Sequence, residues 1–175
     1  MAYELIKSTP VYQGKLMKVQ EDIIKMPDGK EAVRETVFWK NACAILPVDE
    51  EGNILFVRQY RHAFGEMILE IPAGKIEEGE EPLNCALREL AEETGFVAGK
   101  MTFLCESYTA VAYSAQRVFL FEAQELMRGE QNLDEDEFIT LEKYQPEEAV
   151  KMIAEGKIKD AKTITAILMY QNRHK

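Results

Sequence analysis

Three glutamates lie close together at the centre of the chain, in the segment from Arg88 to Phe96. Glu89, Glu92 and Glu93 are spaced at i, i+3 and i+4, so a helix would bring them to the same side. Like charges at this spacing repel one another, whereas hard divalent cations prefer carboxylate oxygens. A solvated acidic face is the commoner explanation for such a cluster, and a metal site is the alternative.

The carboxylates need a helix that holds them rigidly, and the surrounding residues predict one. Pro82 is favoured as a first helical residue, and Gly95 is a natural C-terminal cap. At about 100° per residue, an apolar stripe forms beside the carboxylates, and we expect it to face the core. The stripe consists of Leu83, Ala86, Leu87, Leu90 and Thr94.

A glycine and a further glutamate precede this helix at defined distances. The whole segment reads Gly74-x5-Glu80-x7-Arg88-Glu89-Leu90-x-Glu92-Glu93-x-Gly95-Phe96. The pattern resembles the Nudix box, the signature of Nudix hydrolases, at every specified position. The resemblance implies an α+β fold, the Nudix α/β/α sandwich around a mixed sheet. It also implies hydrolysis of a nucleoside diphosphate linked to another group, with Mg²⁺ as cofactor and Mn²⁺ as the alternative.

The same resemblance implies roles for individual residues. Glu89 and Glu93 would bind metal directly, and Glu92 would share a bridging or water-mediated role. The carbonyl of Ala73 is a further candidate ligand, and Arg88 would orient a box carboxylate by pairing with it. Bound metal would neutralise the diphosphate and activate water for attack on phosphorus.

Other positions in this region have structural interpretations. Glu80 would close the loop onto the helix, while Gly74 and Gly95 would serve backbone geometry. Cys85 lies one turn before Glu89, and we expect it to be a small filler side chain.

The flanking sequence resembles one branch of the family, the ADP-ribose pyrophosphatases and nucleoside-diphosphate-sugar hydrolases. The supporting segments are VRQYRHAFGEMILEIPAGKIEEGEEP, LDEDEFI and EGKIKDAKTITAILMYQ. The resemblance implies that Arg61 contacts the diphosphate or terminal ribose; a surface strand end is its alternative. Glu35 and Trp39 would meet the nucleobase, although Trp39 is equally interpretable as core or dimer packing. Glu70 is expected to be a site residue or a simple strand-end charge.

One loop departs from the family pattern. In the loop from Tyr108 to Arg117, Val111 stands where a proline is expected and Gln116 stands near the expected glutamate. A neutral glutamine cannot act as a general base. Glu92 would then take that role, or an acid from the run 134–137, with Glu137 as a possible site member, or no dedicated base is needed.

The first forty residues predict a charged β-hairpin, with strands at 16–26 and 31–40 joined by the turn 27–30. We therefore divide the chain into a hairpin region, 1–40, and a Nudix domain, 41–175. The hairpin strands cannot bury themselves alone, and in the resembled branch such a hairpin packs against a partner subunit. We expect a homodimer.

Further strands are expected at 42–48, 54–57, 67–71, 101–107, 117–123 and 138–144, and amphipathic helices at 146–155 and 161–172. Interleaved strands and helices favour a layered arrangement, but the strand order is not readable from the pattern.

Composition limits the partners and the cellular location. The net charge is −10, so the surface repels nucleic acid and anionic membranes, and an anionic substrate would need a cation between itself and the protein. Cys43, Cys85 and Cys105 follow no zinc spacing and indicate reduced thiols. Neither a signal peptide nor a membrane-spanning run is apparent. We expect a cytoplasmic protein.

These inferences converge on a Mg²⁺-dependent pyrophosphohydrolase for ADP-ribose or a related nucleotide sugar, releasing a nucleoside monophosphate and a sugar phosphate. Hydrolysis of another nucleoside diphosphate derivative, such as GDP-mannose, a dinucleoside polyphosphate or a damaged nucleotide, remains an alternative. A non-catalytic ADP-ribose sensor is a third hypothesis, because the altered loop leaves room for binding without turnover.

Overall fold

The computed structural model describes residues 2–133 and 138–174, and within it the chain forms two compact units. The first unit contains the residues through Asn41 together with Tyr108–Arg117. The second contains Ala42–Ser107 and the chain from Val118 onward.

The first unit is built on an antiparallel sheet in the order β1-β2-β3. Its strands are β1 (Glu4–Gln13), β2 (Lys18–Lys25) and β3 (Glu31–Phe38). The predicted hairpin is confirmed as β2–β3, and its turn closes with Gly29 at a φ of 86°, a conformation that glycine adopts without strain. Strand β1 was not predicted, because it is exposed at almost every position and so lacks a periodic apolar pattern.

The segment Tyr108–Arg117 belongs to this first unit because it pairs with β3. The Val37 N–H donates to the Tyr113 carbonyl at 2.7 Å, and the Ala115 N–H donates to the Val37 carbonyl at 3.0 Å. The Gln116 amide donates to the Lys40 carbonyl at 2.9 Å. Gln116, which stands near the position of the expected glutamate, therefore has a structural bond within the first unit.

The second unit contains the remaining strands and all three helices that the structure describes. The strands are β4 (Ala42–Pro47), β5 (Ile54–Arg61), β6 (Glu66–Glu70), β7 (Ala73–Lys75), β8 (Phe96–Tyr108), β9 (Arg117–Arg128) and β10 (Thr140–Tyr144). The helices are α1 (Pro82–Thr94), α2 (Pro146–Ala154) and α3 (Ala161–Arg173). The last residue of β8, Tyr108, and the first residue of β9, Arg117, belong to the first unit.

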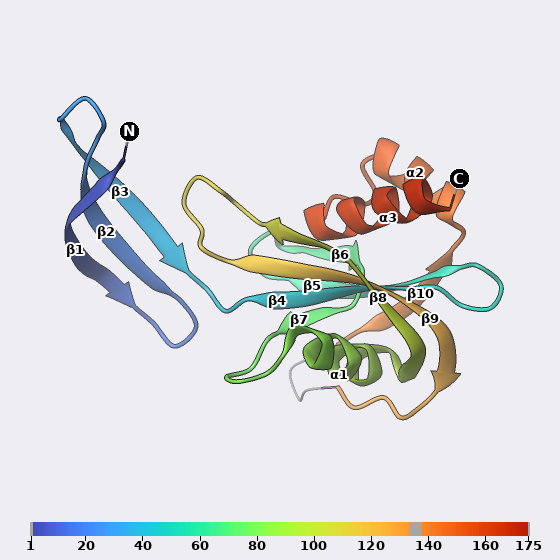
Figure 1. Cartoon of the computed structure of the whole chain (residues 1–175). Coiled ribbons are helices and arrows are strands. Elements are labelled where there is room, and N and C mark those ends of the chain that lie inside the picture. The colour runs from blue at the N-terminus through green and yellow to red at the C-terminus, as the bar shows by residue number, and fades with distance from the viewer. Residues whose placement is uncertain (1, 134–137, 175) are drawn as a thin grey trace. The chain divides into compact units, whose positions relative to one another are not determined.

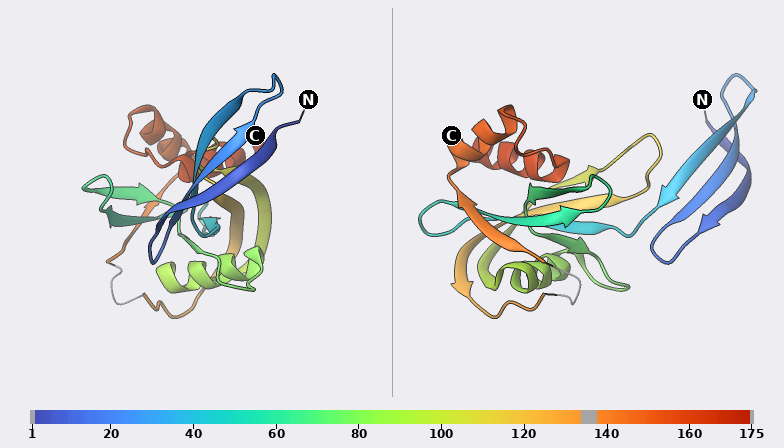
Figure 2. Two further views of the ribbon diagram at one scale, coloured as in Figure 1. Left: turned by 90° about the vertical axis from the view of Figure 1, so that its left-hand side faces the viewer. Right: turned by 180° about the vertical axis from the view of Figure 1, so that it is seen from behind.

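The strands of the second unit form two sheets, β7-β4-β9-β8 and β10-β5-β6. In the four-stranded sheet, β4 runs parallel to β9 and antiparallel to β7, so this sheet is mixed. Successive residues of β4 point to opposite faces, as the strand period requires. Cys43 and Ile45 pack with the α1 residues, whereas Ala44 and Leu46 pack with those of α2 and α3. Helices thus cover both sides of β4 (Figures 1 and 2), and the expected α+β sandwich is confirmed.

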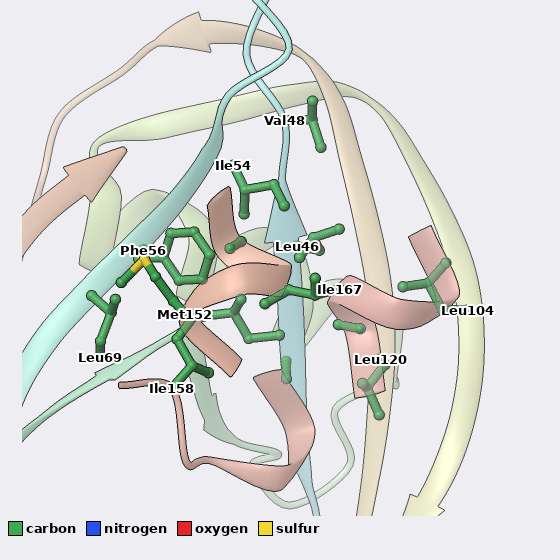
Figure 3. Packing of buried hydrophobic residues seen from close by; sticks show 14 of the residues in the cluster. Leu46, Val48, Ile54, Phe56, Leu69, Leu104, Leu120, Met152, Ile158 and Ile167 are labelled. Atoms are coloured by element: carbon green, nitrogen blue, oxygen red, sulfur yellow. The ribbon is translucent and has the colours of Figure 1, made fainter. Parts of the chain in front are cut away.

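The larger hydrophobic core lies between the sheets and the pair α2–α3 (Figure 3). Phe56, Leu69 and Leu46 contribute from the strands, and Met152 and Ile167 contribute from the two helices. Fully burying a side chain of this kind stabilises a protein by about 1.5–3 kcal/mol. This core holds α3 against the sheet, where β4 is its main strand contact.

Helix α1 ends as predicted, but only part of the apolar stripe expected to face the core is buried. Gly95 caps it with a φ of 70°. Leu83 and Leu87 are 46% and 37% exposed, so the predicted burial was wrong for these two, whereas Ala86, Leu90 and Thr94 of the same stripe are buried as expected. The buried positions are Cys85, Ala86, Glu89, Leu90, Glu93 and Thr94. Small side chains let the helix approach β4 and β7 closely, and this turns two of the three carboxylates inward.

The three cysteines are free thiols, as expected, and Cys85 is a fully buried filler. Across the part of the chain that the structure describes, no helix combines the length and the apolar character needed to cross a bilayer.

Candidate metal and diphosphate site

The inward carboxylates of α1 meet the start of β7. Glu89 and Glu93 are only 8% and 2% exposed. The Glu93 carboxylate accepts a hydrogen bond from the Ala73 N–H at 3.0 Å. Ala73, the predicted carbonyl ligand, and Glu93, a predicted carboxylate ligand, are therefore neighbours joined by a direct bond.

Arg88 explains how one helix carries three nearby carboxylates. Its guanidinium donates to Glu80 at 2.9 Å, to Glu89 at 2.7 Å and to Glu92 at 2.9 Å. It also donates to the Lys75 carbonyl at 3.1 Å. These bonds, the one to Glu80 above all, raise the pKa of Arg88 above its usual range. The expected pairing of Arg88 with box carboxylates is thus present.

Glu80 closes the loop before α1. One oxygen accepts the Glu77 N–H at 2.9 Å, and the carboxylate is also bonded to Arg88. The hydrogen bond from Arg88 is the main reason that the pKa of Glu80 falls from 4.5 to about 2. The loop is therefore pinned to the helix by a carboxylate that is ionised across the neutral and mildly acidic range.

We expect Glu80→Gln to lower the free energy of unfolding by about 1–2 kcal/mol at neutral pH, because the variant loses a charge-assisted hydrogen bond. Since the folded pKa lies below the unfolded one, this stability is complete above pH 4.5 and is lost as the pH falls through about 2. Urea unfolding of both proteins at falling pH should show the difference shrinking. The exposed Glu78→Gln is the control, and a difference independent of pH would contradict the assignment.

Gly74 allows the Glu89 carboxylate to lie against the backbone of β7. A Cβ at this position would lie 1.8 Å from the carboxyl carbon of Glu89 and 1.9 Å from its Oε1. The glycine therefore leaves a space that the Glu89 carboxylate fills. This close approach brings the carboxylates of α1 to the Ala73–Gly74 backbone.

These groups fit a divalent metal. Buried carboxylate oxygens and a backbone carbonyl are the donors that Mg²⁺ and Mn²⁺ select. Within residues 2–133 and 138–174, no three acidic, His or Cys side chains already form a metal cluster. In the structure, Arg88 forms ion pairs with Glu89 and Glu92.

A second charged group lies beside the same loop. Glu70, at 2% exposure, binds Arg61 through two bonds of 2.5 and 2.9 Å and binds Lys162 at 2.5 Å. Burial would lower the pKa of Arg61, but the hydrogen bonds and charge of Glu70, with the charge of Glu93, raise it overall. Arg61 is therefore a cation close to the α1 carboxylates, where an anionic substrate could reach it.

Sequence reasoning missed Lys162, although it lies in a segment that carried the family resemblance. A lysine on an amphipathic helix usually belongs to a solvated face, so its residue type gave no signal. Gln131 was also not predicted. Its side-chain amide donates to the Glu93 carbonyl at 2.6 Å, and the neighbouring Asn132 N–H donates to the Glu92 carbonyl at 3.2 Å. These bonds satisfy carbonyls in the last turn of α1, which a helix leaves without partners.

The remaining predicted site residues belong to other parts of the chain. Glu35 is exposed on β3, and Trp39, half-buried, follows that strand; both belong to the first unit. Their roles at the nucleobase stay predictions. The run 134–137, with Glu137, falls outside the described residues. His62 contacts the Tyr60 ring, and His174 lies 3.2 Å from the buried Glu122, so the two histidines have different partners.

The fold and the carboxylate helix fit a hydrolase of α/β/α architecture that uses a divalent metal, and comparison with known proteins identifies the family. The NUDIX domain model matches residues 38–167, and the model named nucleoside diphosphate sugar hydrolase N-terminal domain matches residues 3–37. The chain belongs to the Nudix hydrolase family, whose members generally use divalent metal.

Two curated relatives resemble the chain over almost its whole length. The ADP-ribose pyrophosphatase of Bacillus subtilis is 39% identical, over 95% of this chain and 91% of its own. The methanol dehydrogenase activator of Bacillus methanolicus is 38% identical with the same coverage. Among solved structures, an ADP compounds hydrolase aligns with a TM-score of 0.88 at 22% identity, covering 98% of this chain and 94% of the other. That last likeness shows the fold.

Proposed function

We propose that this protein is a Mg²⁺-dependent pyrophosphohydrolase that cleaves the diphosphate of ADP-ribose or a related nucleotide sugar. The products are a nucleoside monophosphate and a sugar phosphate. The observation that carries the proposal is the contact between the buried α1 carboxylates and the Ala73–Gly74 backbone, beside the Arg61–Glu70 pair. The similarity to an ADP-ribose pyrophosphatase over 95% of the chain supports the choice of substrate.

In this proposal Glu89, Glu93 and the Ala73 carbonyl would hold the metal directly, and Glu92 would act through a bridging or water-mediated contact. Bound Mg²⁺ supplies charge neutralisation at the diphosphate and lowers the pKa of water. Arg61 binds the diphosphate, which suits a guanidinium because its planar fork matches phosphate oxygens. Arg88 keeps Glu80, and with it the preceding loop, attached to the helix. Water attacks phosphorus, the anhydride P–O bond breaks, and the second phosphate leaves with the bonding electrons.

The general base is assigned to an acid and not to Gln116. The Gln116 amide is bonded to the Lys40 carbonyl and carries no titratable proton. Among the residues that the structure describes, Glu92 is the candidate for the general base, because it lies on α1 and is only half-buried. An acid of the 134–137 run is the alternative.

A substrate panel tests the proposed function directly. ADP-ribose, GDP-mannose and a dinucleoside polyphosphate are incubated with the protein at increasing Mg²⁺, and the products are separated by ion-exchange chromatography. We expect ADP-ribose to be cleaved fastest and EDTA to abolish cleavage. Preference for another member of the panel would reassign the substrate. Thermal stabilisation by ADP-ribose without turnover would support the sensor hypothesis instead.

We further propose that the protein forms a homodimer through its N-terminal sheet. That sheet exposes large apolar side chains, among them Leu5, Val11, Tyr12 and Val33, each more than half exposed. Burying them against a second copy would be favourable by about 25 cal/mol per Å². Sedimentation should give a particle of twice the 20.0 kDa chain mass. Leu5→Glu together with Val33→Glu should shift it toward a monomer, whereas a wild-type monomer would refute the dimer.

A further inference from the structure

A buried hydroxyl of helix α3 bonds to the loop that leads into β7. Thr163 is fully buried, and its Oγ1 accepts a hydrogen bond from the Ile71 N–H at 2.9 Å. The two residues are separated by 92 positions in the chain. Ile71 is also fully buried, so its N–H depends on a protein partner.

Asp160 fixes the direction in which that hydroxyl points. Its Oδ2 accepts the Thr163 hydroxyl proton at 2.6 Å and the Thr163 N–H at 3.0 Å. Lys162 lies 3.1 Å from the same oxygen. Because the hydroxyl donates to a carboxylate, its lone pairs remain available for the Ile71 N–H. The N-terminal cap of α3 therefore also serves as the orienting group for Thr163.

The backbone beyond Ile71 is anchored at each following residue. The Pro72 carbonyl accepts the Ile45 N–H at 2.9 Å, and the Ala73 N–H donates to Glu93 at 3.0 Å. The bond from Thr163 is thus the first of three consecutive anchors that end at a proposed metal ligand. Loss of the first anchor would let the chain rotate before Ala73, and both the Ala73 carbonyl and the Glu93 carboxylate would lose their alignment.

We propose that Thr163 is a positioning residue for the metal site, acting through the Ile71–Ala73 backbone on the Ala73 carbonyl and on Glu93. The proposal rests on the metal site proposed above and extends it to a helix outside the Nudix box. Groups that orient metal ligands in this way affect metal affinity or activity by about 10–100-fold when they are lost.

Three variants form the test. Thr163→Val keeps the side-chain shape and removes the hydroxyl, Thr163→Ser keeps the hydroxyl, and Thr165→Val is the matched control. The Thr165 hydroxyl donates to Ala161 within its own helix, so its loss does not reach the loop. Each protein is measured for kcat, KM and half-saturating Mg²⁺ with ADP-ribose. Without substrate, the rise in Tm produced by Mg²⁺ and by Mn²⁺ is measured as well.

For Thr163→Val we expect half-saturating Mg²⁺ to rise by about 10-fold or more, with lower kcat, a KM within about 3-fold of wild type, and a smaller metal-induced rise in Tm. Thr163→Ser should restore most of each quantity, and Thr165→Val should match wild type. If Thr163→Val does not fold, Thr163→Ala removes the same hydroxyl without placing a methyl group against the Ile71 N–H.

The proposal would be overturned if Thr163→Val and Thr165→Val showed the same half-saturating Mg²⁺ and the same metal-induced rise in Tm. It would also be overturned if Thr163→Ser did not restore these quantities toward wild type. A wild-type protein that cleaves no member of the panel would refute the proposed function alone. The metal-induced rise in Tm would still compare the Thr163 variants in that case, so the two failures are distinguishable.

Discussion

Replacing Glu93 by glutamine is expected to lower kcat by more than about 100-fold while leaving the fold intact. Loss of a residue that only orients a metal ligand lowers metal affinity or activity by about 10–100-fold. Loss of a ligand itself should therefore lower activity further. The glutamine carbonyl oxygen can still accept the Ala73 N–H that Glu93 accepts now at 3.0 Å. The substitution thus removes the charge that a metal needs and keeps the neighbouring bond. Steady-state hydrolysis of ADP-ribose measures the loss, and urea unfolding without metal checks the fold.

Glu81→Gln provides the matched control for this result. Glu81 is the residue before α1, is exposed, and makes no side-chain cap bond to the helix. Its neutralisation changes the net charge by the same amount without touching the site, so kcat should stay within about 2-fold, as surface changes usually have small effects. Activity near wild type in the Glu93 variant would remove this residue from the proposed ligands.

The second large effect is expected from a single methyl group. In Gly74→Ala the new Cβ would fall within about 2 Å of the Glu89 carboxylate, which must then move away (1.8 Å to the carboxyl carbon). A carboxylate at the end of a flexible side chain can move at little cost in stability, but it cannot then occupy the same position as a ligand. We therefore expect a loss of activity of about 100-fold or more and a change in unfolding free energy within about 1 kcal/mol.

Gly99→Ala separates this effect from a general response to added bulk. A Cβ at Gly99 would also approach a glutamate, 2.8 Å from Oε2 of Glu125, but Gly99 and Glu125 lie on strands β8 and β9 and Glu125 is not a proposed ligand. That variant should lose stability to a similar or greater extent and keep its activity. If Gly74→Ala lost stability and activity in proportion, the ligand displacement would not be the cause. Half-saturating Mg²⁺ for the two variants completes the comparison.

The sequence alone was sufficient for the parts of the site that lie close together in the chain. The helix limits, the Gly95 cap and the pairing of Arg88 with box carboxylates all follow from spacings of a few residues or from the family signature. The α+β sandwich followed from the same resemblance. Local patterns carry this information because helix geometry fixes which neighbours meet.

Other features depend on contacts that no local pattern reports. Leu83 and Leu87 looked like a core stripe, but the close approach of Gly74 turned Glu89 and Glu93 toward the sheet instead. The bond between Thr163 and Ile71 joins residues 92 positions apart, and only the packing of α3 creates it. Strand β1 has no buried face, so its hydrogen bonds to β2 were not foreseeable from hydrophobic periodicity.

The pairing of β3 with the segment Tyr108–Arg117 bears on how this chain could be recombined with its relatives. The two family models meet between residues 37 and 38, which suggests a convenient point for exchanging N-terminal sheets. A chimera joined there would pair Val37 of one protein with the backbone of a 108–117 segment from the other protein. The first unit is therefore encoded in two separate stretches of sequence, and a transplant of the whole unit includes the 108–117 segment along with the first forty residues.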